Sequence, residues 1–194
     1  FVDNFYKKIN VTDIKEYHVL KKAILSNTFP WYIEKYGDEN ILEKNNVNTF
    51  NFLCHIVVRR GEGKINSDIY EPTMDFLYAC AKKHKFKIKQ IYRMAYNLTY
   101  PCRLEKSGPH ADLLTSHKNI IIYFKNDEHN LGTVVYEDKL KEDATSGYTN
   151  DNSHMKILKE TKGHEGTGIM FDGENYHEAY FPKKGKRIAL VVNI

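Results

Sequence analysis

The chain has 194 residues, of which 41% are hydrophobic and 28% are charged. This composition is typical of one soluble globular domain and excludes disordered, collagenous and disulfide-rich secreted classes. The formal net charge of +4 comes mainly from lysines spread along the sequence, so charge alone does not indicate a nucleic-acid-binding protein. No signal-peptide pattern and no apolar run of membrane-spanning length occurs, which predicts a cytoplasmic protein (of the host cell, if viral) without a membrane partner.

The first 87 residues are expected to support the fold rather than to carry its chemistry. Apolar residues recur at helical spacing through residues 14–25, and a second helix is predicted across residues 71–84. Between them, residues 49–58 (TFNFLCHIVV) are apolar and rich in β-prone side chains, which predicts a buried strand. This part of the chain is therefore expected to pack against a β-rich remainder.

From about residue 88 the hydrophobic period changes from helical spacing to two. A strand over residues 88–101 puts Tyr96, Leu98 and Tyr100 on one face, and short β-prone segments with Gly, Asn and Asp turns continue to the last residue. The charge-rich span 137–167 interrupts them, either as a substrate lid or as a surface loop without a role. The pattern predicts a single α+β domain over residues 1–194, mainly β with N-terminal helices, whose core is a sandwich or barrel over residues 88–194.

A histidine and a carboxylate stand two residues apart in SGPHADLL (107–114), directly after a Gly-Pro turn. In a strand, this spacing would point His110 and Asp112 to the same face. A third candidate, His177, follows an Asp-Gly turn 67 residues after His110 (177 − 110). Two neutral imidazoles and one carboxylate on one side of an ion form the facial triad of non-haem Fe(II) oxygenases, which leaves coordination positions open. The three residues are therefore candidate metal ligands.

An arginine lies ten residues beyond His177 (187 − 177), at the start of the last β-prone segment. In that segment Arg187, Ala189, Val191 and Asn193 share one face, and the opposite face is wholly apolar. An arginine that faces the interior of a small barrel is costly unless an anion meets it. Because a guanidinium holds a carboxylate through two parallel bonds, Arg187 is a candidate for binding a dicarboxylate beside the metal.

The chain resembles the Fe(II)- and 2-oxoglutarate-dependent dioxygenases, specifically the prolyl-4-hydroxylase-like branch that phages and marine microbes also carry. The segments that carry the resemblance are PHAD (109–112), IYFKND (122–127), LGT (131–133), IMFDGENYH (169–177) and KRIALVVNI (186–194). The resemblance implies a double-stranded β-helix, or jelly roll, with N-terminal helices packed on its larger sheet. It also implies an enzyme that decarboxylates 2-oxoglutarate to succinate and CO2 while it hydroxylates a substrate with O2.

Carried over by residue, the resemblance makes His110, Asp112 and His177 the Fe(II) ligands and Arg187 the partner of the distal carboxylate of 2-oxoglutarate. Tyr100, in the YP position upstream of the HxD, would hydrogen-bond in the cosubstrate pocket. Tyr96 and Asn193 would line the cavity, and ascorbate is a further candidate cofactor.

One departure from the family pattern bears on the choice of site residues. Relatives often have a tyrosine in the strand that corresponds to IYFKND, where it contacts the distal carboxylate. An alignment on the Asn-Asp pair puts Phe124 there, and Tyr123 shares its face with Lys125, which predicts an outward side chain. Tyr123 is therefore not included among the site residues.

Several alternatives remain open. Tyr96 and Tyr100 could be core residues with satisfied hydroxyls, and Asn193 a polar residue at a strand end. His117, His154 and His164 are alternative ligands, but the first is at an odd separation from His110 and the other two lie in the polar span. The expected substrate of the hydroxylase is a peptidyl proline, an amino acid or another small molecule. A nucleic-acid-directed oxygenase and a non-catalytic cupin-type metal-binding protein are the rival predictions.

Overall fold

The strands of the protein form two antiparallel sheets in the computed structural model, which describes residues 4–33, 52–61, 63–128, 132–149 and 153–194. The larger sheet has the order β1-β8-β5-β10-β4-β3-β2, and the smaller has the order β7-β6-β9. In chain order the elements are β1 (Tyr6–Asn10), α1 (Lys15–Ile24), β2 (Tyr32–Ile33), β3 (Phe52–Val58), α3 (Tyr70–His84), β4 (Arg93–Thr99), β5 (Lys118–Asn126), β6 (Thr133–Lys139), β7 (Ile157–Glu160), β8 (Thr167–Asp172), β9 (Asn175–Ala179) and β10 (Arg187–Asn193).

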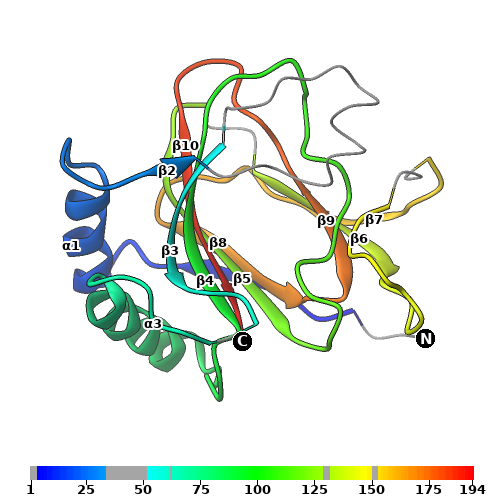
Figure 1. The fold of residues 1–194 in the computed structure, drawn as a ribbon, viewed down its shortest axis with the longest axis horizontal. Helices are drawn as coiled ribbons and strands as arrows, with labels where there is room; N and C mark the ends of the chain where they lie inside the picture. Colours follow the sequence, from blue (N-terminus) through cyan, green and yellow to red (C-terminus); the bar gives the residue numbers. More distant parts are fainter. Residues whose placement is uncertain (1–3, 34–51, 62, 129–131, 150–152) are drawn as a thin grey trace.

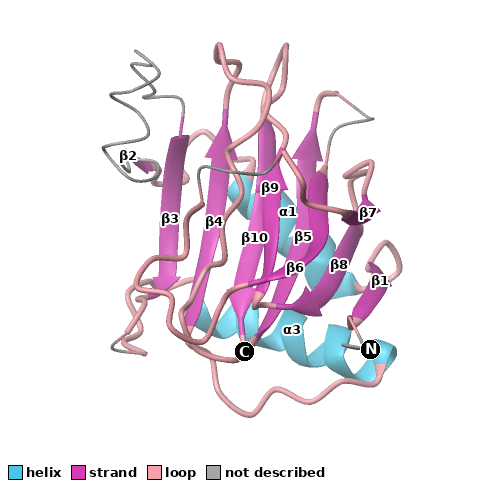
Figure 2. Ribbon diagram, turned by 90° about the vertical axis from the view of Figure 1, so that its right-hand side faces the viewer, coloured by secondary structure: helices cyan, strands magenta, loops and turns pink. Residues whose placement is uncertain are grey.

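The larger sheet is the middle of three layers. Helices α1 and α3 cover one of its faces, and the smaller sheet lies on the other side (Figure 1; Figure 2). The helices expected at residues 14–25 and 71–84 are confirmed, and so is the strand expected at 49–58, of which residues 49–51 lie outside the described ranges. In the part of the chain that the structure describes, no helix is long and apolar enough to cross a membrane.

The last strand, β10, holds the larger sheet together because it pairs with both β4 and β5. Its alternation divides the interior into two cores. Ile188, Leu190 and Val192 pack with the helices, whereas Ala189 and Val191 face the space between the sheets. The predicted alternation of this strand is thereby confirmed, and its polar residues are placed between the sheets.

The span 137–167 is partly built into the fold. Its first residues belong to β6, β7 lies within it, and residues 147–149 run beside the Pro109–Ala111 segment. Ala111 donates its N–H to the carbonyl of Gly147 at 2.8 Å. A Cβ at Gly147 would collide with the carbonyl oxygen of Ala111, so this close approach requires a glycine. The span thus contributes a wall beside the HxD segment.

Candidate metal centre and adjoining cavity

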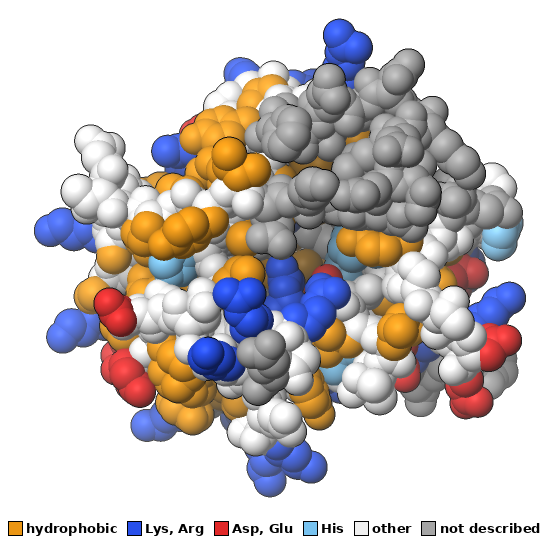
Figure 3. Space-filling view, in the orientation of Figure 1, with side chains coloured by type: hydrophobic (Ala, Val, Ile, Leu, Met, Phe, Trp, Pro, Cys, Tyr) orange, Lys and Arg blue, Asp and Glu red, His pale blue; other side chains and the backbone are white. Residues whose placement is uncertain are grey.

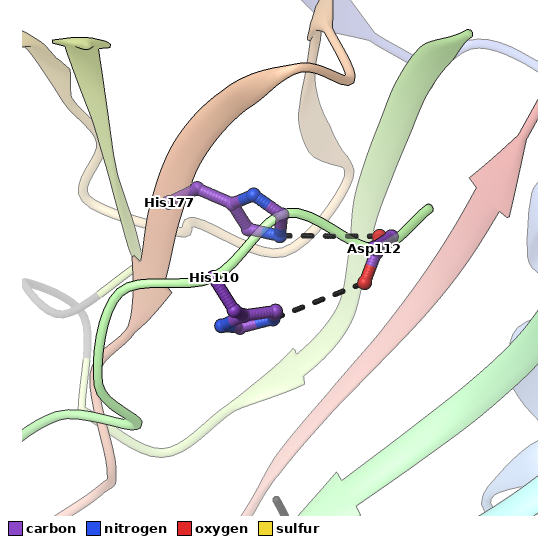
Figure 4. A group of neighbouring side chains, drawn as sticks. All are labelled: His110, Asp112 and His177. Carbon is purple, nitrogen blue, oxygen red and sulfur yellow. Dashed lines mark ion pairs between the residues drawn. The ribbon is translucent and has the colours of Figure 1, made fainter. Parts of the chain in front are cut away.

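Two histidines and an aspartate point toward one another in the space between the sheets (Figure 4). His177 lies on β9, whereas His110 and Asp112 lie on the segment that precedes β5. The Nε2 atom of His110 is 3.8 Å from Oδ1 of Asp112, and that of His177 is 3.9 Å from Oδ2. One candidate ligand atom from each residue lies within 4.8 Å of the other two, so the group could hold a metal ion. The three residues singled out from the sequence therefore meet in space.

The backbone fixes the two histidines as a pair. His110 donates its N–H to the carbonyl of His177 at 3.0 Å, and His177 returns a bond to the carbonyl of His110 at 2.9 Å. The Nδ1 atoms lie 3.0 Å from the carbonyl of Gly108 and 3.4 Å from that of Asn175. Because a carbonyl only accepts, each Nδ1 carries the proton and each Nε2 presents its lone pair to the centre. This is the arrangement that metal-binding histidines use.

Electrostatics favours the protonation states that a metal requires. Burial, together with His110, lowers the pKa of His177 to about 4, although Asp112 opposes the shift. Burial favours the neutral form of Asp112, but interactions with His177, Arg93 and His110 outweigh it and hold the pKa of this carboxyl below its usual range. At neutral pH the centre therefore offers a neutral imidazole from His177 and an ionised carboxylate, as a divalent cation needs.

Asn193 holds the aspartate in place. Its Nδ2 atom donates to Oδ2 of Asp112 at 2.9 Å, and it also contacts Oδ1 of Asn119. Asn193 is fully buried and is not among the residues that line the cavity, so its place is behind Asp112 rather than on the cavity wall.

A cavity of about 420 Å³ adjoins the three residues, and Arg187 lies in its wall. Arg187 is only 4% exposed, its Nη2 donates to Oγ1 of Thr133 at 3.4 Å, and its guanidinium lies 5.3 Å from the ring centre of Tyr123. Among the described residues no carboxylate forms an ion pair with it, and its Nε has no hydrogen-bond partner. A buried, unpaired cation is costly, so this end of the cavity is suited to an anion.

Tyr123 corrects one expectation from the sequence. Its side chain is 1% exposed and faces the space between the sheets, not the solvent. The reason is a β-bulge in β5: Ala189 is opposite Tyr123, but Ile188 is opposite Lys125, so Phe124 is an extra residue. The bulge reverses the alternation, and Tyr123 and Lys125 do not share a face. The hydroxyl of Tyr123 donates to Oγ1 of Thr133 at 2.8 Å, directly beside Arg187.

The expected roles of Tyr96 and Tyr100 are also corrected. Tyr96 lies opposite Leu190 and is fully buried in the core on the helix side, where its hydroxyl is 3.0 Å from Oγ1 of Thr73. Tyr100 follows the end of β4, is 40% exposed and does not line the cavity. The opposite face of β4 lines it instead, through Arg93, Asn97 and Thr99. The alternation of polar residues with Met94, Tyr96 and Leu98 was the signal for this orientation.

The other histidines do not join the centre. His117 is buried with its Nδ1 2.7 Å from the carbonyl of Thr115, and His154 and His164 are exposed. Among the described residues, the group that could hold a metal contains only His110, Asp112 and His177.

No protein-family model matches the sequence, and no curated protein matches it. Solved structures are similar in fold. A 2OG-Fe(II) oxygenase family oxidoreductase from Burkholderia pseudomallei is 14% identical, with a TM-score of 0.58 over 90% of this chain and 77% of that chain. The non-haem alpha-ketoglutarate-dependent epimerase SnoN from nogalamycin biosynthesis is 11% identical, with a TM-score of 0.65 over 98% and 78%. A Pseudomonas putida prolyl-4-hydroxylase is 9% identical, with a TM-score of 0.52 over 99% and 93%.

These proteins agree with the resemblance seen in the sequence, and they match nearly the whole chain. At such low identities the agreement concerns the fold. The protein therefore has the fold of 2OG-Fe(II) oxygenases, with a His-Asp-His group and a buried arginine at one cavity.

Proposed function

We propose that the protein is an Fe(II)- and 2-oxoglutarate-dependent dioxygenase that hydroxylates a small-molecule or peptidyl substrate. The two facing sheets would be the halves of a double-stranded β-helix. The observation that carries the proposal is the shared cavity of the His-Asp-His group and Arg187. A metal-binding protein without a cosubstrate has no need of a buried, unpaired guanidinium at that place.

The residues at the cavity fit both Fe(II) and 2-oxoglutarate. Two imidazole nitrogens and one carboxylate oxygen suit Fe(II) and leave coordination positions for other ligands. Asn193 would keep Asp112 oriented toward the ion through the 2.9 Å hydrogen bond, as outer-shell partners of metal ligands do. When bound, Fe(II) and 2-oxoglutarate would supply the oxidising power for hydroxylation, with O2 consumed and succinate and CO2 released.

Arg187 would bind and orient the cosubstrate. Its guanidinium offers two parallel donors to a carboxylate, and Thr133 and the ring of Tyr123 hold it in position. The apolar residues Ile121 and Val191 line the cavity and would limit the access of water. The cosubstrate would thus be held by its distal carboxylate while its 2-oxo acid end meets the metal.

The test is the conversion of 2-oxoglutarate to succinate by purified protein that has been loaded with iron, in the absence of a prime substrate. We expect slow turnover that requires Fe(II) and falls to background in His177→Ala, whose metal content also falls. His164→Ala, which removes an exposed histidine, is the matched control and should resemble the parent protein. Absence of turnover in protein shown to hold iron would favour the non-catalytic rival.

A further inference from the structure

Three arginines besides Arg187 line the same cavity. Arg59 and Arg60 directly follow β3, and Arg93 is the first residue of β4. Arg93 lies opposite Asn193, whereas Arg187 lies opposite Thr99 at the other end of the paired strands. Arg93 and Thr99 are six positions apart on β4 (99 − 93), which is about 20 Å along the strand. The second group of arginines is therefore distinct from the one that would hold 2-oxoglutarate.

The charges on the cavity wall are not balanced. The described lining contains four arginines and one acidic residue, Asp112, which leaves three positive charges in excess (four minus one). A divalent metal ion would add two charges and the 2-oxoglutarate dianion would remove two. The excess of three positive charges would therefore remain after the proposed cofactors are bound.

In the part of the chain that the structure describes, neither Arg60 nor Arg93 forms an ion pair or a side-chain hydrogen bond, although both interact with the charge of Asp112 at longer range. Arg59 differs, because its Nη2 donates to Oδ1 of Asn66 at 3.2 Å. Arg60 is exposed to solvent at one side, but the protein atoms around it, and then the neighbouring Arg93, lower the pKa of its guanidinium below the ordinary value, while Asp112 and Tyr148 oppose the shift. Two guanidinium groups that repel each other at a cavity mouth are typical of an anion site.

Arg93 acts on Asp112 through its charge, which helps to keep the carboxyl ionised, and not through a hydrogen bond or a close ion pair. The carboxylate already receives a hydrogen bond from Asn193, and the described ion pairs of Asp112 are those with His110 and His177. On β3, the cavity-lining Ile56 lies opposite Ala95, near Arg93, whereas Phe52 lies opposite Thr99, at the Arg187 end of the cavity. Figure 3 shows Lys and Arg side chains gathered near the middle of the face drawn in Figure 1, with a histidine beside them.

We propose that Arg60 and Arg93 bind an anionic group of the prime substrate, a small molecule that carries a carboxylate or a phosphate monoester. The inference rests on the proposed function, because it assigns this anion to the substrate of the same metal centre. The two arginines would hold the anionic group, and the carbon skeleton would lie along Ile56 toward His110 and His177. A cavity of about 420 Å³ is of the size that holds small ligands.

The first experiment measures anion binding without turnover, by calorimetric titration of the metal-free protein with inorganic phosphate. We expect Arg60→Gln and Arg93→Gln each to weaken binding about tenfold or more, because each removes a hydrogen-bonded charge contact. Lys64→Gln, an exposed charge in the same turn that does not line the cavity, is the matched control. Arg187→Met tests the location: loss of phosphate binding in this variant alone would overturn the proposal.

The second experiment uses protein loaded with Fe(II) and 2-oxoglutarate under anaerobic conditions. The probes are L-proline against L-prolinamide, O-phospho-L-serine against L-serine, and a short single-stranded oligonucleotide. We expect the member with the additional anionic group, L-proline or O-phospho-L-serine, to bind at least about tenfold more tightly than its counterpart and to lose this advantage in Arg93→Gln. The pair that responds distinguishes a carboxylate from a phosphate.

Equal binding of both members of each pair, or binding of the oligonucleotide alone, would contradict the inference. The second of these outcomes would instead support the nucleic-acid-directed rival. Failure of the proposed function is seen separately, as absent succinate formation in iron-loaded protein. Failure of the anion site is seen in the metal-free titration, whatever the activity.

Discussion

The two faces of β4 and β10 carry different tasks on the same backbone. On the helix side, Tyr96 and Leu190 are opposite each other and fully buried in the larger core. On the cavity side, Arg93 and Arg187 stand where a purely stabilising core would have apolar residues. Because side chains alternate along a strand, core residues on the helix side are direct neighbours in sequence of residues on the cavity side. One face should therefore affect the unfolding free energy, and the other should affect ligand binding.

The largest expected effect is on the helix side. Leu190→Ala removes a fully buried side chain from the larger core, so the free energy of unfolding should fall by about 2–5 kcal/mol. Urea denaturation followed by circular dichroism measures this change. The fraction that remains folded should bind 2-oxoglutarate as the parent protein does. A decrease in the free energy of unfolding of less than about 1 kcal/mol would contradict the assignment of stability to the helix-side face.

An intermediate effect is expected on the cavity side of the same strand. Arg187→Met should weaken 2-oxoglutarate binding about 10–100-fold, because it removes a charge-assisted contact of about 1.5–3 kcal/mol. The free energy of unfolding should stay the same or rise, since the variant removes a buried cation with an unpartnered Nε. Calorimetry with 2-oxoglutarate and urea denaturation measure the two quantities. A destabilisation as large as that of Leu190→Ala would assign Arg187 a structural role.

The smallest effect comes from a matched pair of tyrosines. Tyr96→Phe and Tyr123→Phe each remove one buried tyrosine hydroxyl. The hydroxyl of Tyr96 is hydrogen-bonded to Thr73, and that of Tyr123 is hydrogen-bonded to Thr133. Each should lower the free energy of unfolding by about 0.5–1.5 kcal/mol. Only Tyr123→Phe should also weaken 2-oxoglutarate binding, by a few-fold, because Thr133 and the Tyr123 ring contact Arg187. If both variants weakened 2-oxoglutarate binding equally, the proposed difference between the helix side and the cavity side would be wrong.

The sequence predicted the parts of the site that depend on short spacings. His110 and Asp112 share a segment, and the alternation of β10 places Arg187 and Asn193 on one face. The period of a strand says which residues share a face, but it does not say which face points inward. That choice depends on the partner strands, and pairing with Leu190 puts Tyr96 on the helix side.

Two further features depend on contacts between distant segments. The bulge in β5 moves Lys125 away from the face that Tyr123 shares with Ile121, and no turn residue in IYFKND announces it. Arg60 and Arg93 are 33 residues apart in sequence (93 − 60) and meet at one cavity only because β3 pairs with β4. Neither feature has a local pattern, so neither could be read from spacing alone.

The reciprocal backbone hydrogen bonds between His110 and His177 affect how the metal site forms. Both imidazoles are brought into reach by one pair of amides that joins β9 to the HxD segment, so a chain in which β9 has not yet docked offers no complete chelate. Any ion that prefers the finished geometry will, by mass action, favour the docked form over the open one. Metal binding and docking of β9 would then be linked equilibria, and slower hydrogen exchange at these two amides on addition of metal would report the linkage.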